Sequence, residues 1–318
     1  MKNNSFKYWG LAILAVVGAY GAVQVFSAEK PEPAVTVSVD PRVEMMAIIF
    51  RLAGNKEYGE SDLPSYARDV DDHFAPFKNH PVVKLAARLA KEKDNGYDAP
   101  MRLAVHFTDT ASFGEKVPFS AKPEMLFLRW SKEDLDKFIP LARDFARKSD
   151  FNGFYAAHQP LYDLAVQRMR AVMKETAHLD WFPAFFGPAD NMDFRVVLGM
   201  MNGGNSYGPK VILPGGHEEI YAIIGVSQAD KKGEPVFPEW MMGTITHEFG
   251  HSYVNPLVDR FSKELKSPGR KLYAKVEDQM KAQAYGVWTT VVVESVNRAC
   301  VLRYQLANYG PKYMEKSA

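Results

Sequence analysis

The sequence predicts an α+β fold that is mostly helical, with a small sheet placed just before one particular helix. Apolar residues recur at helical spacing through most of the chain, whereas short strand-like runs gather between residues 194 and 226. The 318 residues are 47% hydrophobic and 24% charged, which is ordinary globular composition. This length is enough for one large domain or two small ones with a substantial core.

The N-terminus has the pattern of a secretory signal peptide. Lys2 and Lys7 precede an apolar stretch that ends at the small residues Ser27 and Ala28. We expect cleavage of residues 1–27 and a secreted or periplasmic location in a bacterium, with no stable membrane insertion afterwards. The alternative is an uncleaved N-terminal membrane anchor, with the rest of the chain facing away from the cytoplasm.

The remaining chain divides into three parts. Residues 28–39 form a Pro-rich spacer with a candidate short strand over 35–39. Residues 40–190 form a mainly helical N-terminal region. Residues 191–318 contain the small sheet and the helix that carries the chemistry.

Helix signals dominate residues 40–190. Asp40 followed by Pro41 is typical of a helix start, and apolar spacing continues to Gly54. Residues 97–107 are ambiguous by periodicity. Similar patterns predict further helices at residues 65–74, 81–93 and 131–149, and one that begins at Pro160.

The pattern changes after Pro183. Strands are expected at 194–200, 210–213 and 219–226. The chain is then expected to return to helix from Pro238 onward. Breaks are expected near Pro256, Pro268 and Gly286.

Charge and cysteine content exclude several classes of protein. The chain has 39 Lys and Arg against 38 Asp and Glu, so no electrostatic argument favours a nucleic-acid partner. The single cysteine, Cys300, excludes an intrachain disulfide framework and a CxxC zinc knuckle. It is expected to be a buried small hydrophobe on an apolar helix.

The motif HExxH at residues 247–251 carries the chemistry. His247 and His251 lie one helical turn apart on one face, so both imidazoles can bind one zinc ion at about 2.0–2.1 Å. Glu248 lies beside that position and can take a proton from a zinc-bound water. The helix also has an apolar face, formed by Met242, Ile245, Phe249 and Tyr253. This face favours a metal site over a solvated surface helix.

A catalytic zinc needs a third protein ligand and an open position. Glu294 is the favoured candidate, because a carboxylate in the apolar run of residues 288–296 is costly unless it is paired or bound to metal. The alternative interpretation is an ion pair with Arg298. Asp259 is the next candidate ligand, whereas Glu277 and Asp278 are simplest as a solvated helix face.

HExxH followed by a Glu on a later helix resembles the gluzincin class of zincin metallopeptidases. The segments HEFGHSYVNPLVDR and VVVESVNRA are also similar to a bacterial family of predicted secreted peptidases known as a domain of unknown function. The resemblance covers most of residues 40–310. It implies a zincin-like catalytic region at 191–318, Zn²⁺ held by His247, His251 and Glu294, and Glu248 as general base.

The expected function is therefore an exported zinc metallopeptidase that hydrolyses peptide bonds in a peptide or protein substrate. The alternatives are a zincin-fold binding module without turnover and a zinc hydrolase acting on a non-peptide linkage, such as one in the cell wall. By resemblance, the strand at 219–226 is expected to pair with the substrate backbone. The residue that stabilises the oxyanion is not determined among five candidates: Tyr207, His217, Tyr253, Tyr285 and Arg298.

Overall fold

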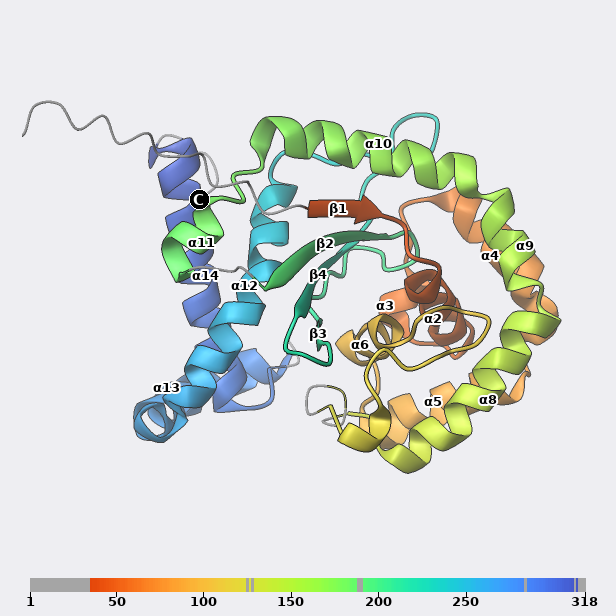
Figure 1. Cartoon of the computed structure of the whole chain (residues 1–318), viewed down its shortest axis with the longest axis horizontal. Coiled ribbons are helices and arrows are strands. Elements are labelled where there is room, and N and C mark those ends of the chain that lie inside the picture. The colour runs from red at the N-terminus through yellow and green to blue at the C-terminus, as the bar shows by residue number, and fades with distance from the viewer. Residues whose placement is uncertain are drawn as a thin grey trace, which may run out of the picture. The chain divides into compact units, whose positions relative to one another are not determined.

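The computed structural model describes residues 35–123, 126, 129–187, 191–282, 285–311 and 313 (Figure 1). The predicted signal peptide and most of the predicted spacer lie outside these residues. These described residues form one unit by their contacts. Among the described residues, no helix has the length and apolarity that a membrane span requires.

The α+β prediction is confirmed. The described strands form one mixed sheet in the order β1-β2-β4-β3. The strands are β1 (Val35–Ser38), β2 (Met192–Gly199), β3 (Lys210–Ile212) and β4 (Glu218–Gly225). β1, β2 and β4 run parallel, and β3 is antiparallel to β4. Because β1 pairs with β2, the sheet joins the spacer to the C-terminal region.

Most of the described chain is helical, and the helices predicted in the N-terminal region are present. Residues 97–107, ambiguous in sequence, are mainly the helix α6. The N-terminal helices are α2 (Pro41–Leu52), α3 (Lys56–Gly59), α4 (Pro64–Phe74), α5 (Pro81–Lys93), α6 (Asp98–His106), α8 (Lys132–Lys148), α9 (Phe151–Ala157), α10 (Gln159–Thr176) and α11 (Trp181–Phe186). The C-terminal helices are α12 (Met241–Arg260), α13 (Ser262–Ala282) and α14 (Trp288–Tyr309).

The sheet separates two groups of helices. The ring of Phe249 on α12 contacts Phe194 on β2 at 4.9 Å between centroids, so α12 covers this face. Figure 1 shows α14 beside α12, and the two helices are in contact. Helices α2 and α6 contact β2 and β3 respectively. Arg195 follows Phe194 on β2 and therefore points to the opposite face of the sheet.

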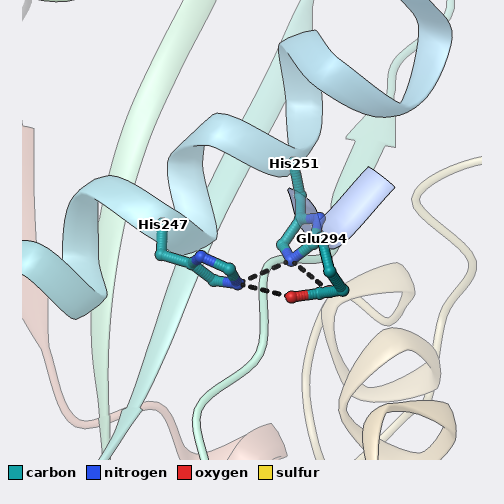
Figure 2. Close-up of side chains that lie close together, drawn as sticks. All are labelled: His247, His251 and Glu294. Atoms are coloured by element: carbon teal, nitrogen blue, oxygen red, sulfur yellow. Dashed lines mark hydrogen bonds and ion pairs between the residues drawn. The ribbon is translucent and has the colours of Figure 1, made fainter. Parts of the chain in front are cut away.

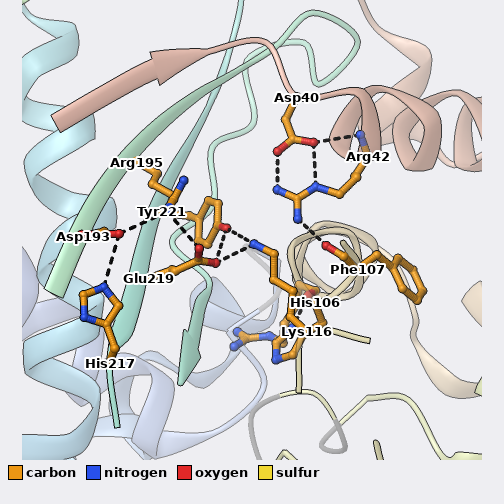
Figure 3. Close-up of polar contacts among 11 residues, drawn as sticks. Asp40, Arg42, His106, Phe107, Lys116, Asp193, Arg195, His217, Glu219 and Tyr221 are labelled. Atoms are coloured by element: carbon orange, nitrogen blue, oxygen red, sulfur yellow. Dashed lines mark hydrogen bonds and ion pairs between the residues drawn. The ribbon is translucent and has the colours of Figure 1, made fainter. Parts of the chain in front are cut away.

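Figure 3 shows an ion-pair cluster on the face of the sheet away from α12. Lys116 Nζ donates to Glu219 Oε2 at 2.6 Å and to the Tyr221 hydroxyl at 2.9 Å. Arg195 Nη2 lies 2.9 Å from Glu219 Oε1. Because Lys116 comes from the loop after α6, the cluster ties this loop to β2 and β4. Asp40 and Arg42 form a second pair near the start of α2.

Two of the predicted helix breaks are wrong. Pro256 lies inside α12 and Pro268 lies inside α13. Val254 and Val258, on either side of Pro256, are both buried, so packing keeps α12 helical despite the lost backbone hydrogen bond. The break at Gly286 is confirmed, because α13 ends before it and α14 begins after it.

The expectation that residues 219–226 pair with a substrate is also wrong. This segment corresponds to β4, which lies between β2 and β3. Both of its edges already form backbone hydrogen bonds within the sheet. A further strand cannot pair with β4, whereas β3 is the strand at this edge of the sheet.

Candidate metal centre

Helix α12 carries the HExxH motif and fixes which way its side chains point. Met242, Ile245 and Phe249 are fully or almost fully buried, as the apolar spacing predicts. His247 and His251 lie on another face of the helix, with 21% and 17% of their side chains exposed. The packing of the apolar face therefore leaves both imidazoles within reach of solvent.

The two histidines meet one carboxylate from another helix (Figure 2). His247 Nε2 and His251 Nε2 lie 3.2 Å apart. Glu294 on α14 places Oε2 3.4 Å from His247 Nε2 and Oε1 3.5 Å from His251 Nε2. Within the described part of the chain, these three residues form the group of potential metal ligands that lies together. The structure thus brings Glu294 to the motif histidines.

These separations fit a zinc ion. Two ligand atoms at 2.0–2.1 Å from a tetrahedral zinc are about 3.3 Å from each other. The nearest separations, 3.2, 3.4 and 3.5 Å, are close to this value, with Glu294 Oε2 nearest His247 and Glu294 Oε1 nearest His251. Glu294 Oε2 is shielded from solvent, and its ion-pair contacts are long, at 3.4 Å to His247 Nε2 and 3.8 Å to Arg298 Nε. A buried oxygen of this kind is costly unless a cation binds it.

Asn255 orients the second histidine. Its Oδ1 lies 3.1 Å from His251 Nδ1. An amide oxygen only accepts, so Nδ1 carries the proton and Nε2 keeps its lone pair for a metal. Asn255 was not among the residues predicted from the sequence, although its place four residues after His251 puts it one turn further along the same face.

Electrostatics favour the metal-binding protonation state at two of the three residues. Burial raises the pKa of the Glu294 carboxyl, but hydrogen bonding to His247 and the charges of both histidines outweigh it and hold the pKa below its ordinary value. Burial lowers the pKa of His251, and the charge of His247 lowers it further. The Glu294 carboxylate and the neutral His251 imidazole are the protonation states that bind zinc. At His247, burial lowers the pKa, but hydrogen bonding to Glu294 and the charge of Glu248 outweigh it and raise the pKa.

Glu248 is buried beside this group, with 7% of the residue exposed. Burial raises the pKa of its carboxyl to about 7, while the charge of His247 opposes the shift. A carboxylate whose pKa lies near neutrality can both accept and donate a proton at physiological pH. This property is the one expected of a general base in the HExxH motif.

Tyr285 and Arg298 flank the carboxylate of Glu294. Arg298 Nε lies 3.8 Å from Glu294 Oε2, and Arg298 Nη2 donates to the Tyr285 hydroxyl at 3.4 Å. Burial raises the pKa of Tyr285, and the charge of Glu294 raises it further. Two of the five candidates for oxyanion stabilisation therefore lie next to the predicted metal ligand.

The other oxyanion candidates have different surroundings. His217 lies 3.3 Å from Asp193, at the start of the sheet (Figure 3). The ring of Tyr253 stacks on Phe186 at 4.4 Å. Tyr207 is buried, and its hydroxyl makes no hydrogen bond within the described residues.

The remaining carboxylate candidates lie apart from the cluster. Asp259 is exposed near the end of α12. Glu277 forms an ion pair with Lys281 at 2.8 Å on α13, and Asp278 is exposed. Glu277 and Asp278 thus form the solvated helix face that the sequence predicts. Cys300, expected to be a buried small hydrophobe, is half-buried on α14.

Sequence reasoning did not find the contribution of α6. Asp98 raises the pKa of Glu248, after the larger effects of burial, His247 and Glu294. Arg102 lowers the pKa of His251 by a similarly small contribution. These residues lie roughly 150 positions before the motif, so no local spacing could have identified them.

Together these features define an α+β protein with three potential metal ligands on two packed helices. The chain belongs to the family described as Domain of unknown function (DUF4932), whose profile matches residues 35–316. Comparisons with curated proteins and with solved structures gave no match.

Proposed function

We propose that this protein is an exported zinc metallopeptidase with a zincin-like, gluzincin-type site. One observation carries the proposal. His247, His251 and Glu294 come together with separations that suit one tetrahedral zinc, and Glu248 is buried beside them. Export is proposed from the sequence of residues 1–27.

The residues present fit the requirements of the reaction. Zinc bound by His247, His251 and Glu294 would act as a Lewis acid and lower the pKa of a bound water. Glu248 accepts a proton at its carboxylate and later donates it to the leaving amine. Tyr285, next to Glu294, is the favoured hydroxyl donor to the developing oxyanion.

The sheet supports a peptide as the substrate. β3 is an edge strand, and Ile212 on it is 49% exposed. The segment before β3 contacts α12 at Glu248. An extended peptide can pair with an edge strand near the motif. The opposite edge strand, β1, is less suited to this role because α10 contacts it. Arg170 Nη2 on α10 donates to the Val37 carbonyl of β1 at 3.2 Å.

The variant Glu248→Gln tests the proposed reaction. It removes the proton acceptor and leaves the three metal ligands in place. We expect zinc to be retained and hydrolysis of a fluorogenic peptide library to be lost. The matched control is Glu264→Gln, a change at an exposed residue of α13. This control should leave zinc binding and peptide hydrolysis unchanged. Hydrolysis by Glu248→Gln at the wild-type rate would refute the mechanism. Zinc binding without hydrolysis by the wild type would favour the binding-module alternative.

A further inference from the structure

Asn297 connects the two helices that carry the metal ligands. It lies on α14 three residues after Glu294, so both side chains share one helix face. Its Nδ2 donates to the backbone carbonyl of His247 on α12 at 2.8 Å. Asn297 is completely buried. Asn297 therefore bonds to the backbone of one predicted ligand, His247, and lies one helical turn from another, Glu294.

Gly250 makes room for this contact. A Cβ atom added to Gly250 would lie 2.1 Å from Asn297 Oδ1, far closer than two such atoms can approach. Asn297 Oδ1 is buried and makes no hydrogen bond to any described residue. Its position is thus set by close packing on the α12 backbone between His247 and His251. Any larger side chain at position 250 must displace the Asn297 amide.

We infer that Asn297 and Gly250 form a lock that holds Glu294 at the distance from His247 and His251 that zinc binding requires. This inference rests on the proposed function. Asn297 is a positioning residue, since it contacts the backbone of a ligand and not the reacting atoms. Losing the lock allows α14 to shift relative to α12, and the carboxylate shifts with it. Residues that orient metal ligands typically contribute 10–100-fold to metal affinity.

Zinc affinity, measured by chelator competition on the full-length protein, tests the lock. We expect Asn297→Ala and Gly250→Ala each to weaken zinc binding roughly 10–100-fold. The loss of zinc affinity in the double variant should be smaller than the product of the two single-variant losses. The reason is that the new methyl at position 250 fills space that the amide leaves. The matched control is Asn308→Ala, because the Asn308 amide donates to the Tyr304 carbonyl of its own helix. The control should bind zinc like the wild type.

A second variant separates positioning from stability. Asn297→Leu keeps the branched shape of the side chain but lacks the hydrogen-bond donor. Urea unfolding of each zinc-free variant shows how much stability is lost without metal. A purely structural role predicts lower zinc-free stability and unchanged zinc affinity of the folded protein.

The possible results have distinct meanings. Weaker zinc binding by both Asn297 variants and by Gly250→Ala, with the control unchanged, supports the lock. If folded Asn297→Leu and Gly250→Ala bind zinc within about twofold of the wild type, the lock is refuted and the proposed function stands. If the wild type binds no zinc, the proposed function fails, and the inference fails with it.

Discussion

The backbone of Gly208 lies directly against the carbonyl oxygen of Glu248. A Cβ atom at position 208 would lie 2.3 Å from that oxygen. Gly208 comes just before β3, so this contact holds the edge strand against the motif helix. The close approach requires a residue without a side chain at position 208.

Gly208→Ala is therefore expected to destabilise the protein. The added methyl forces the start of β3 away from α12, and overpacking of this kind typically costs about 1–3 kcal/mol of unfolding free energy. Urea denaturation measures this loss. The matched control is Gly204→Ala, where the nearest atom to an added Cβ is Ser227 Cβ at 3.9 Å. Equal stability of the two variants would show that the contact is not tight.

Tyr285→Phe tests the proposed oxyanion donor. Removing the hydroxyl should lower kcat by about 10²–10³-fold, the usual cost of losing such a donor, while zinc content stays the same. The hydroxyl contacts Arg298 beside Glu294 and does not contribute to the apolar core. Steady-state kinetics and zinc analysis on one preparation give both quantities.

Tyr253→Phe is the matched control for this substitution. The Tyr253 hydroxyl makes no hydrogen bond within the described residues, and its ring stacks on Phe186. We expect little change in kcat. A normal kcat in Tyr285→Phe would show that Arg298 or another donor stabilises the oxyanion.

Glu44 is a buried carboxyl that predicts a pH dependence of stability. It accepts hydrogen bonds from Met200 N at 2.7 Å and from the Tyr66 hydroxyl at 2.8 Å. Burial nevertheless raises its pKa from 4.5 to about 7. Since the folded state then binds a proton that the unfolded chain releases, this contribution to stability is lost as pH rises from about 4.5 to 7.

Glu44→Gln should remove this dependence. The amide can still accept from Met200 N and remains neutral at every pH. We expect the variant to gain stability relative to wild type as pH rises from 5 to 8, by up to about 3 kcal/mol. Urea unfolding at both pH values measures the difference, and exposed Glu92→Gln is the control. A difference that is independent of pH would contradict the assignment.

Local patterns predicted much of the candidate site. HExxH spacing alone places two imidazoles on one helix face, and this depends only on helix geometry. Glu294 was found because a carboxylate in an apolar run needs a partner. The structure brings it to both histidines, at 3.4 and 3.5 Å.

Features set by packing between distant segments could not be predicted. The interior position of β4 depends on its pairing with β2 and β3, which no local pattern encodes. Pro256 was expected to end α12, but buried neighbours on both sides of it keep the helix intact. The contact of Asn297 with His247 spans 50 residues and appears only when α14 packs on α12.

Zinc content tests the central claim most directly. Elemental mass spectrometry on the purified protein should find about one zinc per chain in the wild type and clear loss in Glu294→Ala. Glu277→Ala, which removes a surface ion pair on α13, should keep its zinc. Zinc retained in Glu294→Ala would show that another residue is the third ligand. No zinc in the wild type, even after reconstitution, would contradict the account.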